Sequence, residues 1–317
     1  MRSDPSVHNR APWRVLVNPT SGAGRGGRAA TALTRELVAR GVPFARIDTT
    51  HRGHARSLAA ATPPGTPVLV VGGDGTVHEV VAGLPVHDRQ LGPLAILPCG
   101  SGDDFARSVG SDGDVARLVQ ALAGTPRLVD VGLATLGTGT TGVRERFANA
   151  AGLGFDAEVA AQACRPHRLR GRLHYARSTF AVLRRPHRLT ATITLDTGTG
   201  PQRLPTRDFA FVATCNGQYF GGGLHLVPHG RCDDGRLDAV AVDAVGPLGL
   251  LWLLAKLCCG RHCRDRRVRL DAVTRLTIEL AAPTACAFDG EPWPERVQRI
   301  HYELAPERLR LLGTTAR

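Results

Sequence analysis

Residues 68–79 read Val-Leu-Val-Val-Gly-Gly-Asp-Gly-Thr-Val-His-Glu, an apolar run that ends abruptly in glycines and a carboxylate. A run of this kind is typical of a strand buried on both faces of a parallel sheet. Further strands are expected over 13–17, 44–48 and 94–97, with a helix over 28–40. Strands that alternate with helices predict a Rossmann-like α/β domain with its ligand site at the carboxyl ends of the strands.

The pattern changes after about residue 134, where short runs of alternating polar and apolar side chains predict an antiparallel β-sandwich. The expected strands cover 189–195, 208–215, 236–242, 268–270, 276–280 and 297–304, and the expected helices cover 156–163 and 170–184. We therefore expect an α/β domain over 1–134 and a β-sandwich domain over 135–304. Residues 305–317 are a segment that can return to the first domain.

Composition excludes several classes of protein. The chain has 317 residues, 43% of them hydrophobic and 21% charged, which is the range of a globular protein. Its net charge is 40 − 28 = +12, yet Lys256 is its single lysine. A Walker-type loop needs a Gly-Lys-Ser/Thr sequence, so it is excluded. Eight cysteines without zinc-site spacing, and no signal-peptide pattern, lead us to expect reduced thiols in a cytoplasmic protein.

Glycine-rich turns follow three of the predicted strands. The first, 18–27, fits Gly-x-Gly-x-x-Gly only weakly, because Asp48 lies too far along the chain for the dinucleotide fingerprint. The second is 72–79 and the third is 98–105. A glycine-rich strand-to-helix turn is an anion site, because its free backbone N–H groups face the ligand. We expect the three turns to converge on one crevice.

Six segments in order carry a family resemblance. They are Asn-Pro-Thr-Ser-Gly (18–22), Gly-Gly-Asp-Gly-Thr-Val-His-Glu (72–79), Gly-Ser-Gly-Asp-Asp-Phe-Ala-Arg (100–107), Gly-Phe-Asp-Ala-Glu-Val (154–159), Asp-Asp-Gly-Arg-Leu-Asp (233–238) and Phe-Asp-Gly-Glu (288–291). The series resembles the diacylglycerol kinase catalytic-domain family of lipid kinases. Gly-Gly-Asp-Gly alone is shared with NAD kinases, whereas the six segments together are specific.

The resemblance implies a set of residues that contact ATP. They are Asn18, Pro19, Thr20, Ser21, Gly22, Thr50, Gly73, Asp74, Gly75, Thr76, Val77, His78, Glu79 and Ser101. Ser101 stands where the family usually has threonine, and both side chains carry a hydroxyl. Asp103 stands where the family usually has asparagine, which removes two N–H donors and adds a negative charge near the phosphates.

The resemblance also assigns the catalytic carboxylates. Glu291 resembles the family's general base, since an alcohol acceptor is a poor nucleophile until a carboxylate takes its proton. We expect Asp74 to hold Mg²⁺ beside the triphosphate, with Asp130 as a second acidic candidate or, equally, a turn-capping residue. A structural metal site is implied at Asp234 with the backbone carbonyls of Arg231 and Arg236. A simple turn is the alternative there.

Two segments bear on a membrane. Eight arginines lie between Arg165 and Arg188, interleaved with aromatic residues. They form either a solvated helix face or a basic surface that contacts anionic lipid. The longest apolar run, 245–259, is too short to span a bilayer, so it is a core helix or a segment that dips into a membrane face. We expect peripheral membrane contact, leave a homodimer open, and expect no nucleic-acid partner.

These observations predict an ATP- and Mg²⁺-dependent lipid kinase that phosphorylates a hydroxyl of diacylglycerol or a related lipid alcohol. A role in phospholipid biosynthesis follows from that resemblance. Two alternatives stay open. One is an NAD kinase-like phosphotransferase with a soluble acceptor, and the other is a non-catalytic regulator that binds lipid or nucleotide.

Overall fold

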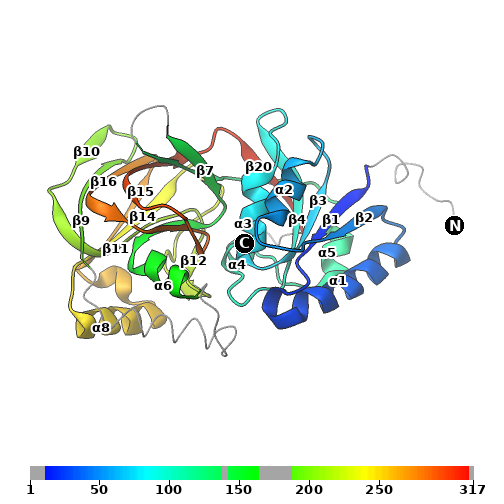
Figure 1. The fold of residues 1–317 in the computed structure, drawn as a ribbon, viewed down its shortest axis with the longest axis horizontal. Helices are drawn as coiled ribbons and strands as arrows, with labels where there is room; N and C mark the ends of the chain where they lie inside the picture. Colours follow the sequence, from blue (N-terminus) through cyan, green and yellow to red (C-terminus); the bar gives the residue numbers. More distant parts are fainter. Residues whose placement is uncertain (1–10, 138–141, 164–187, 314–317) are drawn as a thin grey trace.

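The computed structural model describes residues 11–137, 142–163 and 188–313. The helix expected over 170–184 lies outside the described residues, as do all arginines of the 165–188 segment except Arg188. Figure 1 shows two parts side by side, an α/β part that carries the N-terminus and a part made mainly of strands.

The α/β part is built on one mostly parallel sheet. Its strands are β1 (Trp13–Val17), β2 (Phe44–Asp48), β3 (Val68–Gly72), β4 (Gln90–Pro98), β5 (Arg127–Val129) and β20 (Arg308–Leu312), in the order β2-β1-β3-β4-β20-β5. Its helices are α1 (Ser21–Ala39), α2 (His54–Ala60), α3 (Asp74–Gly83), α4 (Asp104–Ser108) and α5 (Val115–Ala121). Only β5 runs antiparallel to its neighbour β20.

Strand β3 shows why this sheet needs helices on both faces. Val68 and Val70 are fully buried in the core that includes residues of α2 and α3. Leu69 and Val71 are fully buried in a second core with residues of α1 and α5. Successive side chains of a strand point to opposite faces, so a continuous apolar run requires cover on both. The expectation drawn from 68–71 is confirmed.

The second part is one large, mostly antiparallel sheet. Its strands are β6 (Gly132–Leu136), β7 (Val143–Phe147), β8 (Ala150–Gly154), β9 (Leu189–Asp196), β10 (Pro201–Arg203), β11 (Arg207–Cys215), β14 (Leu237–Asp243), β15 (Val268–Val273), β16 (Arg275–Thr284), β17 (Cys286–Phe288), β18 (Glu291–Pro292) and β19 (Val297–Leu304). Beside it lie the hairpin β12 (Tyr219–Phe220) and β13 (Leu224–His225), α6 (Phe155–Ala163), α8 (Pro247–Cys258) and the short 3-10 turn η3 (His262–Arg264). The predicted fold class is confirmed.

Some boundaries differ from the expectation. Helix α1 begins at Ser21 instead of 28, because the glycine-rich turn itself enters the helix, with non-helical backbone at Gly22, Ala23 and Gly24. Strands β6, β7 and β8 were not predicted individually. Strand β20 pairs with β4 and β5, so the chain returns to the first sheet at its C-terminal end. No helix of the described ranges is long and apolar enough to cross a membrane.

Candidate functional site

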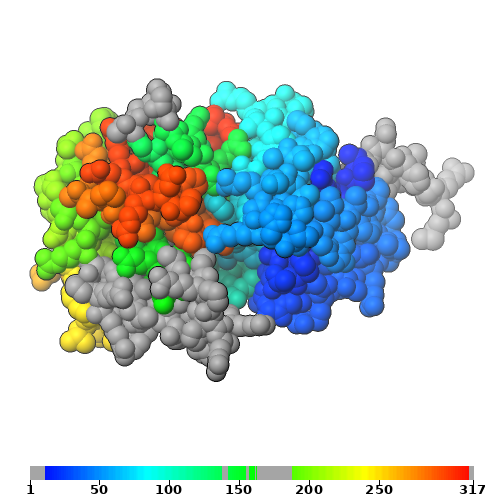
Figure 2. Space-filling model, viewed as in Figure 1, coloured from blue at the N-terminus to red at the C-terminus, as the bar shows by residue number. Residues whose placement is uncertain are grey.

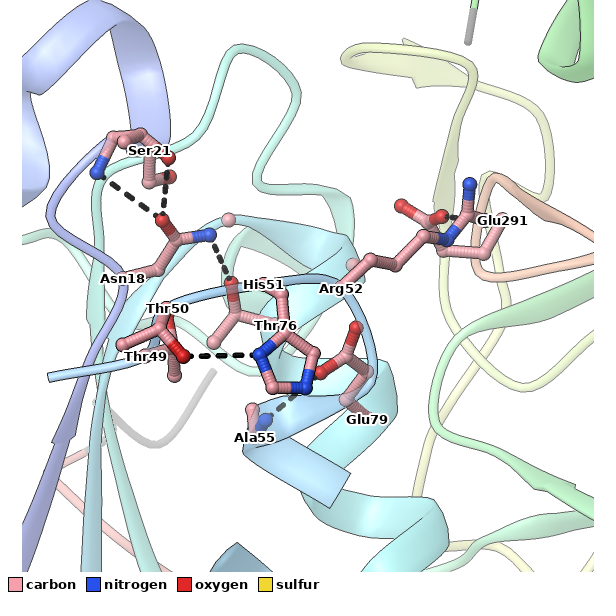
Figure 3. A pocket seen from close by; sticks show the side chains of 13 residues that line it. Asn18, Ser21, Thr49, Thr50, His51, Arg52, Ala55, Thr76, Glu79 and Glu291 are labelled. Carbon is pink, nitrogen blue, oxygen red and sulfur yellow. Dashed lines mark hydrogen bonds and ion pairs between the residues drawn. The ribbon is translucent and has the colours of Figure 1, made fainter. Parts of the chain in front are cut away.

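A pocket of about 440 Å³ lies where the glycine-rich turns of the α/β part face the second part. Its lining residues come from three strand-end segments and one distant turn. They are Asn18, Thr20, Ser21, Thr49, Thr50, His51, Arg52, Ala55, Gly73, Gly75, Thr76, Glu79 and Glu291 (Figure 3). The volume is in the range of pockets that hold small ligands and cofactors.

Asn18 ties the first turn to the second. Its carboxamide oxygen accepts hydrogen bonds from the backbone N–H and the hydroxyl of Thr20 at 3.2 and 2.9 Å. Its Nδ2 donates to Oγ1 of Thr76, at 3.0 Å, in the first turn of α3. One side chain therefore fixes the start of α1 relative to the start of α3, which brings two helix N-termini to the same edge of the sheet.

The second and third turns approach at backbone distance. A Cβ atom added to Gly73 would lie 2.7 Å from Cα of Gly100, so only glycine fits there. The third turn is further held by Arg25 of α1, whose guanidinium donates to the carbonyl of Gly100. Ser101 nevertheless does not line the pocket. The first two turns line the pocket as expected, but the third does not. The third turn packs against the second, and the loop after β2 lines the pocket in place of the third turn.

That loop, residues 49–53, was not predicted beyond Thr50. Both oxygens of the Glu79 carboxylate accept backbone N–H groups at its end, from Gly53 at 2.7 Å and from Ala55 at 3.0 Å. Glu79, which was expected to contact ATP, therefore positions the loop as well as lining the pocket. The loop carries Arg52, the one arginine or lysine among the described lining residues.

Glu291 reaches the pocket from the second part of the molecule. It opens β18, and its carboxylate pairs with the guanidinium of Arg52 at 2.5 Å (Figure 3). A Cβ atom added to Gly75 would lie 2.2 Å from Oε1 of Glu291, so the carboxylate rests on the bare backbone of α3. Burial raises the pKa of Glu291 above its ordinary value, and the positive charges of Arg52 and His78 offset part of that rise.

A buried charged network lies behind Glu291. His78 of α3 contacts Asp289 through Nδ1 at 2.9 Å and Glu145 through Nε2 at 3.1 Å, and Glu145 also pairs with Arg56. Burial lowers the pKa of His78, but the two carboxylates raise it by more, to about 9. His78 is therefore protonated at neutral pH, and two cations face two anions. The network joins α2 and α3 to β7 and the 289–291 turn.

Asp289 is the anchor of the turn that carries Glu291. Its carboxylate accepts three backbone N–H groups, from Ala148 and Ala150 at 2.9 Å and from Asn149 at 2.8 Å. Its backbone adopts a left-handed conformation with φ of 50°. In Figure 2 the blue surface of the first part and the orange-red surface of the second part meet directly.

Asp74 lies in an acidic cluster beside the pocket. Its Oδ1 accepts the backbone N–H of Phe105 at 3.3 Å. Burial raises the pKa of Asp74 well above its ordinary value, and the charges of Asp104 and Asp103 raise it further. The Oδ1 atom of Asp104 is buried without a hydrogen-bond partner. Buried carboxylates that repel one another in this way would be stabilised in their ionised form by a bound cation.

Asp103, at the position where the family usually has asparagine, keeps the local backbone geometry. It adopts φ of 54°, a conformation that asparagine and aspartate tolerate better than other residues with side chains. Its Oδ1 accepts the N–H of Gly100 at 2.8 Å, a role that an amide oxygen also fills. Burial raises the pKa of Asp103, against the opposing effects of that hydrogen bond and of Arg25. The local geometry needs an acceptor there, and the change adds negative charge.

The remaining acidic candidates lie away from the pocket. Asp130 accepts the N–H of Gly235 at 2.8 Å and pairs with Arg308 at 2.9 Å, which are the contacts of a turn-capping residue. Asp234 accepts the N–H of Arg236 at 3.1 Å. Within the described ranges no three acidic, His or Cys side chains gather as metal ligands. The metal site at 231–236 stays a prediction.

The expected ATP contacts divide into two groups. Asn18, Thr20, Ser21, Thr50, Gly73, Gly75, Thr76 and Glu79 line the pocket, whereas Pro19, Gly22, Asp74, Val77, His78 and Ser101 do not. Val77 is buried in the core and His78 in the charged network. Thr49, His51, Arg52 and Ala55 line it without having been expected. Their position directly after β2 could have predicted them, because the carboxyl ends of parallel strands lie at one edge of the sheet.

Comparisons with known proteins agree with this geometry. Residues 12–134 match the model of the diacylglycerol kinase catalytic domain, and residues 149–313 match that of the YegS C-terminal NAD kinase beta sandwich-like domain. A diacylglycerol kinase of Mycobacterium tuberculosis is 32% identical over 307 residues, covering 92% of this chain and 94% of its own. The chain belongs to this lipid kinase family.

Solved structures show the same fold for this family member. A crystal structure of a diacylglycerol kinase from Bacillus anthracis superposes with a TM-score of 0.65 at 20% identity, covering 95% of this chain and 97% of that one. Yeast NADH kinase complexed with NADH superposes with a TM-score of 0.52 at 10% identity, over 99% of this chain and 89% of its own. At these identities the likeness concerns the fold alone.

Proposed function

We propose that this protein transfers the γ-phosphoryl group of ATP, with Mg²⁺, to a hydroxyl of diacylglycerol or a related lipid alcohol. One observation carries the proposal. Glu291, from the second part of the molecule, projects into a pocket whose other described lining residues belong to the first part. A carboxylate base and a set of anion-binding turns then face the same space, as phosphoryl transfer to an alcohol requires.

The nucleotide fits the first-domain wall of the pocket. The starts of α1 and α3 offer backbone N–H groups, and Thr20, Ser21 and Thr50 offer hydroxyls. Gly73 and Gly75 let backbone approach a phosphate without a side chain in the way. Arg52 supplies a guanidinium, whose planar N–H groups match phosphate oxygens. This set binds a triphosphate without a Walker lysine.

Magnesium fits the acidic cluster. Mg²⁺ is usually held by one or two carboxylates together with substrate phosphates and waters, so a three-carboxylate cage is not required. Asp74 and Asp104 offer hard oxygen ligands, and the Oδ1 atom of Asp104 is buried without a hydrogen-bond partner. When bound, the ion would offset negative charge on the phosphate oxygens.

The proton of the acceptor goes to Glu291. As the acceptor oxygen forms its bond to the γ-phosphorus, the bond from that phosphorus to the bridging oxygen of ADP breaks, and the hydroxyl proton passes to the carboxylate. A pKa raised by burial makes Glu291 a stronger base than an exposed glutamate. Arg52 has to release the carboxylate for this step, and the arriving triphosphate offers its guanidinium another anion.

The acceptor class rests on family membership, because a relative that shares both domains is named a diacylglycerol kinase. The test is transfer of radiolabel from γ-labelled ATP to a panel of lipid alcohols presented in detergent micelles, with NAD as a separate arm. We expect label in diacylglycerol or another lipid alcohol, dependent on Mg²⁺. Label in NAD would contradict the proposal and identify a soluble acceptor. No label in any arm would contradict it in favour of a non-catalytic protein that binds lipid or nucleotide.

A further inference from the structure

Helix α8 presents an unusual apolar surface. Seven large hydrophobic side chains are exposed among the described residues, and three of them lie on this helix. They are Leu248, Leu251 and Trp252, which are 83%, 49% and 58% exposed. Their spacing of i, i+3 and i+4 places them on one face of the helix. The other four are scattered singly over the molecule.

The opposite face of α8 already has its packing partners. Leu253 is buried in a core cluster of the second domain, and Leu250 and Leu257 pack against the same cluster. The helix is therefore apolar on two faces, of which only one contacts the protein. Figure 1 places α8 at the end of the second domain that lies away from the α/β part. The 245–259 segment is thus a core helix on one side and an exposed apolar surface on the other.

The exposed charges of the 246–267 segment have one sign. Arg261, Arg264 and Arg266 follow the helix and are exposed. Asp265 is the only acidic residue between Gly246 and Arg267, and it is buried.

Local pairing neutralises that one acidic residue. The Asp265 carboxylate is held by Lys256 at 2.7 Å and by Arg267 at 2.8 Å. The ammonium of Lys256 also lies 5.6 Å from the centre of the Trp252 ring. What reaches solvent from this segment is apolar and basic.

We propose that Leu248, Leu251 and Trp252, with Arg261, Arg264 and Arg266, form the surface by which this protein docks on an anionic lipid bilayer. Aliphatic and tryptophan side chains partition into the headgroup boundary, and arginines beside them pair with anionic headgroups. A second copy of this chain is a less suitable binding partner for this surface, because two such surfaces would bring like charges together. The inference deepens the proposed function, since a diacylglycerol acceptor resides in a bilayer.

The experiment uses the full chain and vesicles of phosphatidylcholine, with or without phosphatidylglycerol, in a flotation assay. The test variant is Leu248→Ser/Leu251→Ser/Trp252→Ser, and the matched control is Val38→Ser/Val143→Ser, which removes exposed apolar side chains elsewhere. We expect wild type and control to bind the anionic vesicles, and the triple variant to bind at least about ten-fold more weakly. Arg261→Gln/Arg264→Gln/Arg266→Gln should weaken binding to a similar degree and abolish its salt dependence.

A second measurement removes any dependence on how the triple variant folds. Brominated acyl chains should quench tryptophan fluorescence of the native chain, and Trp252→Phe should remove that quenching, because Trp13 is buried and Trp293 is partly buried. Equal vesicle binding by the triple variant, no quenching, or a change from dimer to monomer in light scattering would each overturn the proposal. Phosphorylation of a short-chain diacylglycerol dispersed in detergent reports on catalysis separately and should be unchanged in the triple variant.

Discussion

The two walls of the pocket are built on different principles. The first domain contributes twelve of the thirteen lining residues, and most of them are glycines or small hydroxyl residues on turns. The second domain contributes one side chain, Glu291, from a turn anchored by a buried aspartate. The proposed anion binding is thus distributed over backbone groups, whereas the proposed chemistry depends on one carboxylate from the other domain. The variants proposed here change one side of the pocket or the contact between its two sides.

The largest effect on turnover is expected at Asp74. Asp74→Asn should lower kcat by about 10³-fold, because the carboxylate proposed to hold Mg²⁺ is lost. The same variant should be more stable than wild type in the absence of Mg²⁺. The raised pKa of Asp74 means that its ionised form destabilises the fold at neutral pH, and this cost disappears as pH falls through the folded-state value.

Thermal melts with and without Mg²⁺ check this prediction. Wild type should gain stability from the ion and Asp74→Asn should not. Asp112→Asn, at an exposed ion pair with Arg117, is the matched control. Near-normal turnover by Asp74→Asn would remove the role proposed for this residue.

The contact between the walls is tested at Gly75. Gly75→Ala would place a methyl group where Oε1 of Glu291 now lies, so the carboxylate must move. Displacing a catalytic group by about 1 Å costs on the order of 10²-fold in rate, and kcat should fall accordingly with little change in the KM for ATP. Gly246→Ala, where a Cβ atom meets nothing within 4 Å, should behave as wild type. Equal kcat values for the two variants would contradict the predicted clash.

A smaller effect is expected at Arg52. Arg52→Ala should raise the KM for ATP about ten-fold, since one charge-assisted contact to phosphate is lost. It should also shift the acid limb of the kcat/KM profile, which reports on the free enzyme, to higher pH, because the guanidinium holds down the pKa of Glu291 there. Arg40→Ala, which breaks an exposed pair with Glu36, is the control. An unchanged acid limb would show that Arg52 does not act on the base.

The smallest effect on turnover, but a clear one on stability, is expected at His78. Its raised pKa means that its contribution is complete below pH 6.5 and is lost as pH rises through about 9. Between these values wild type should lose on the order of 3 kcal/mol of stability from this group. In denaturant titrations the free energy of unfolding of His78→Gln should no longer fall over this pH range. The variant of an exposed histidine, His87→Gln, should show the same fall as wild type. A wild-type stability that stays constant over this range would contradict the charged network.

The sequence predicted most of the residues that line the pocket. Glycines after buried strands predicted the first two turns that line the pocket, and an Asp-Gly-Glu turn predicted the carboxylate that faces them. Val77 and His78, which were also expected to contact ATP, do not line the pocket. Thr76 and Glu79 share one face of α3, and the two residues between them turn away.

Other features depend on contacts between distant residues and could not be derived from local pattern. His78 meets Asp289 across 211 positions of the chain, and Arg52 meets Glu291 across 239. Neither pair has a motif of its own. The fold class needed only apolar periodicity, whereas these long-range charged contacts between the two domains leave no local pattern in the sequence.

Parallel measurement of turnover and ATP affinity in Glu291→Gln tests the division between the two walls most directly. Gln retains the shape and removes the base, so kcat for a short-chain diacylglycerol in detergent should fall by about 10³-fold. The dissociation constant for ATP, measured by calorimetry, should stay within about two-fold of wild type, because the first domain holds the nucleotide. Turnover within about ten-fold of wild type, or loss of ATP binding together with turnover, would contradict the account.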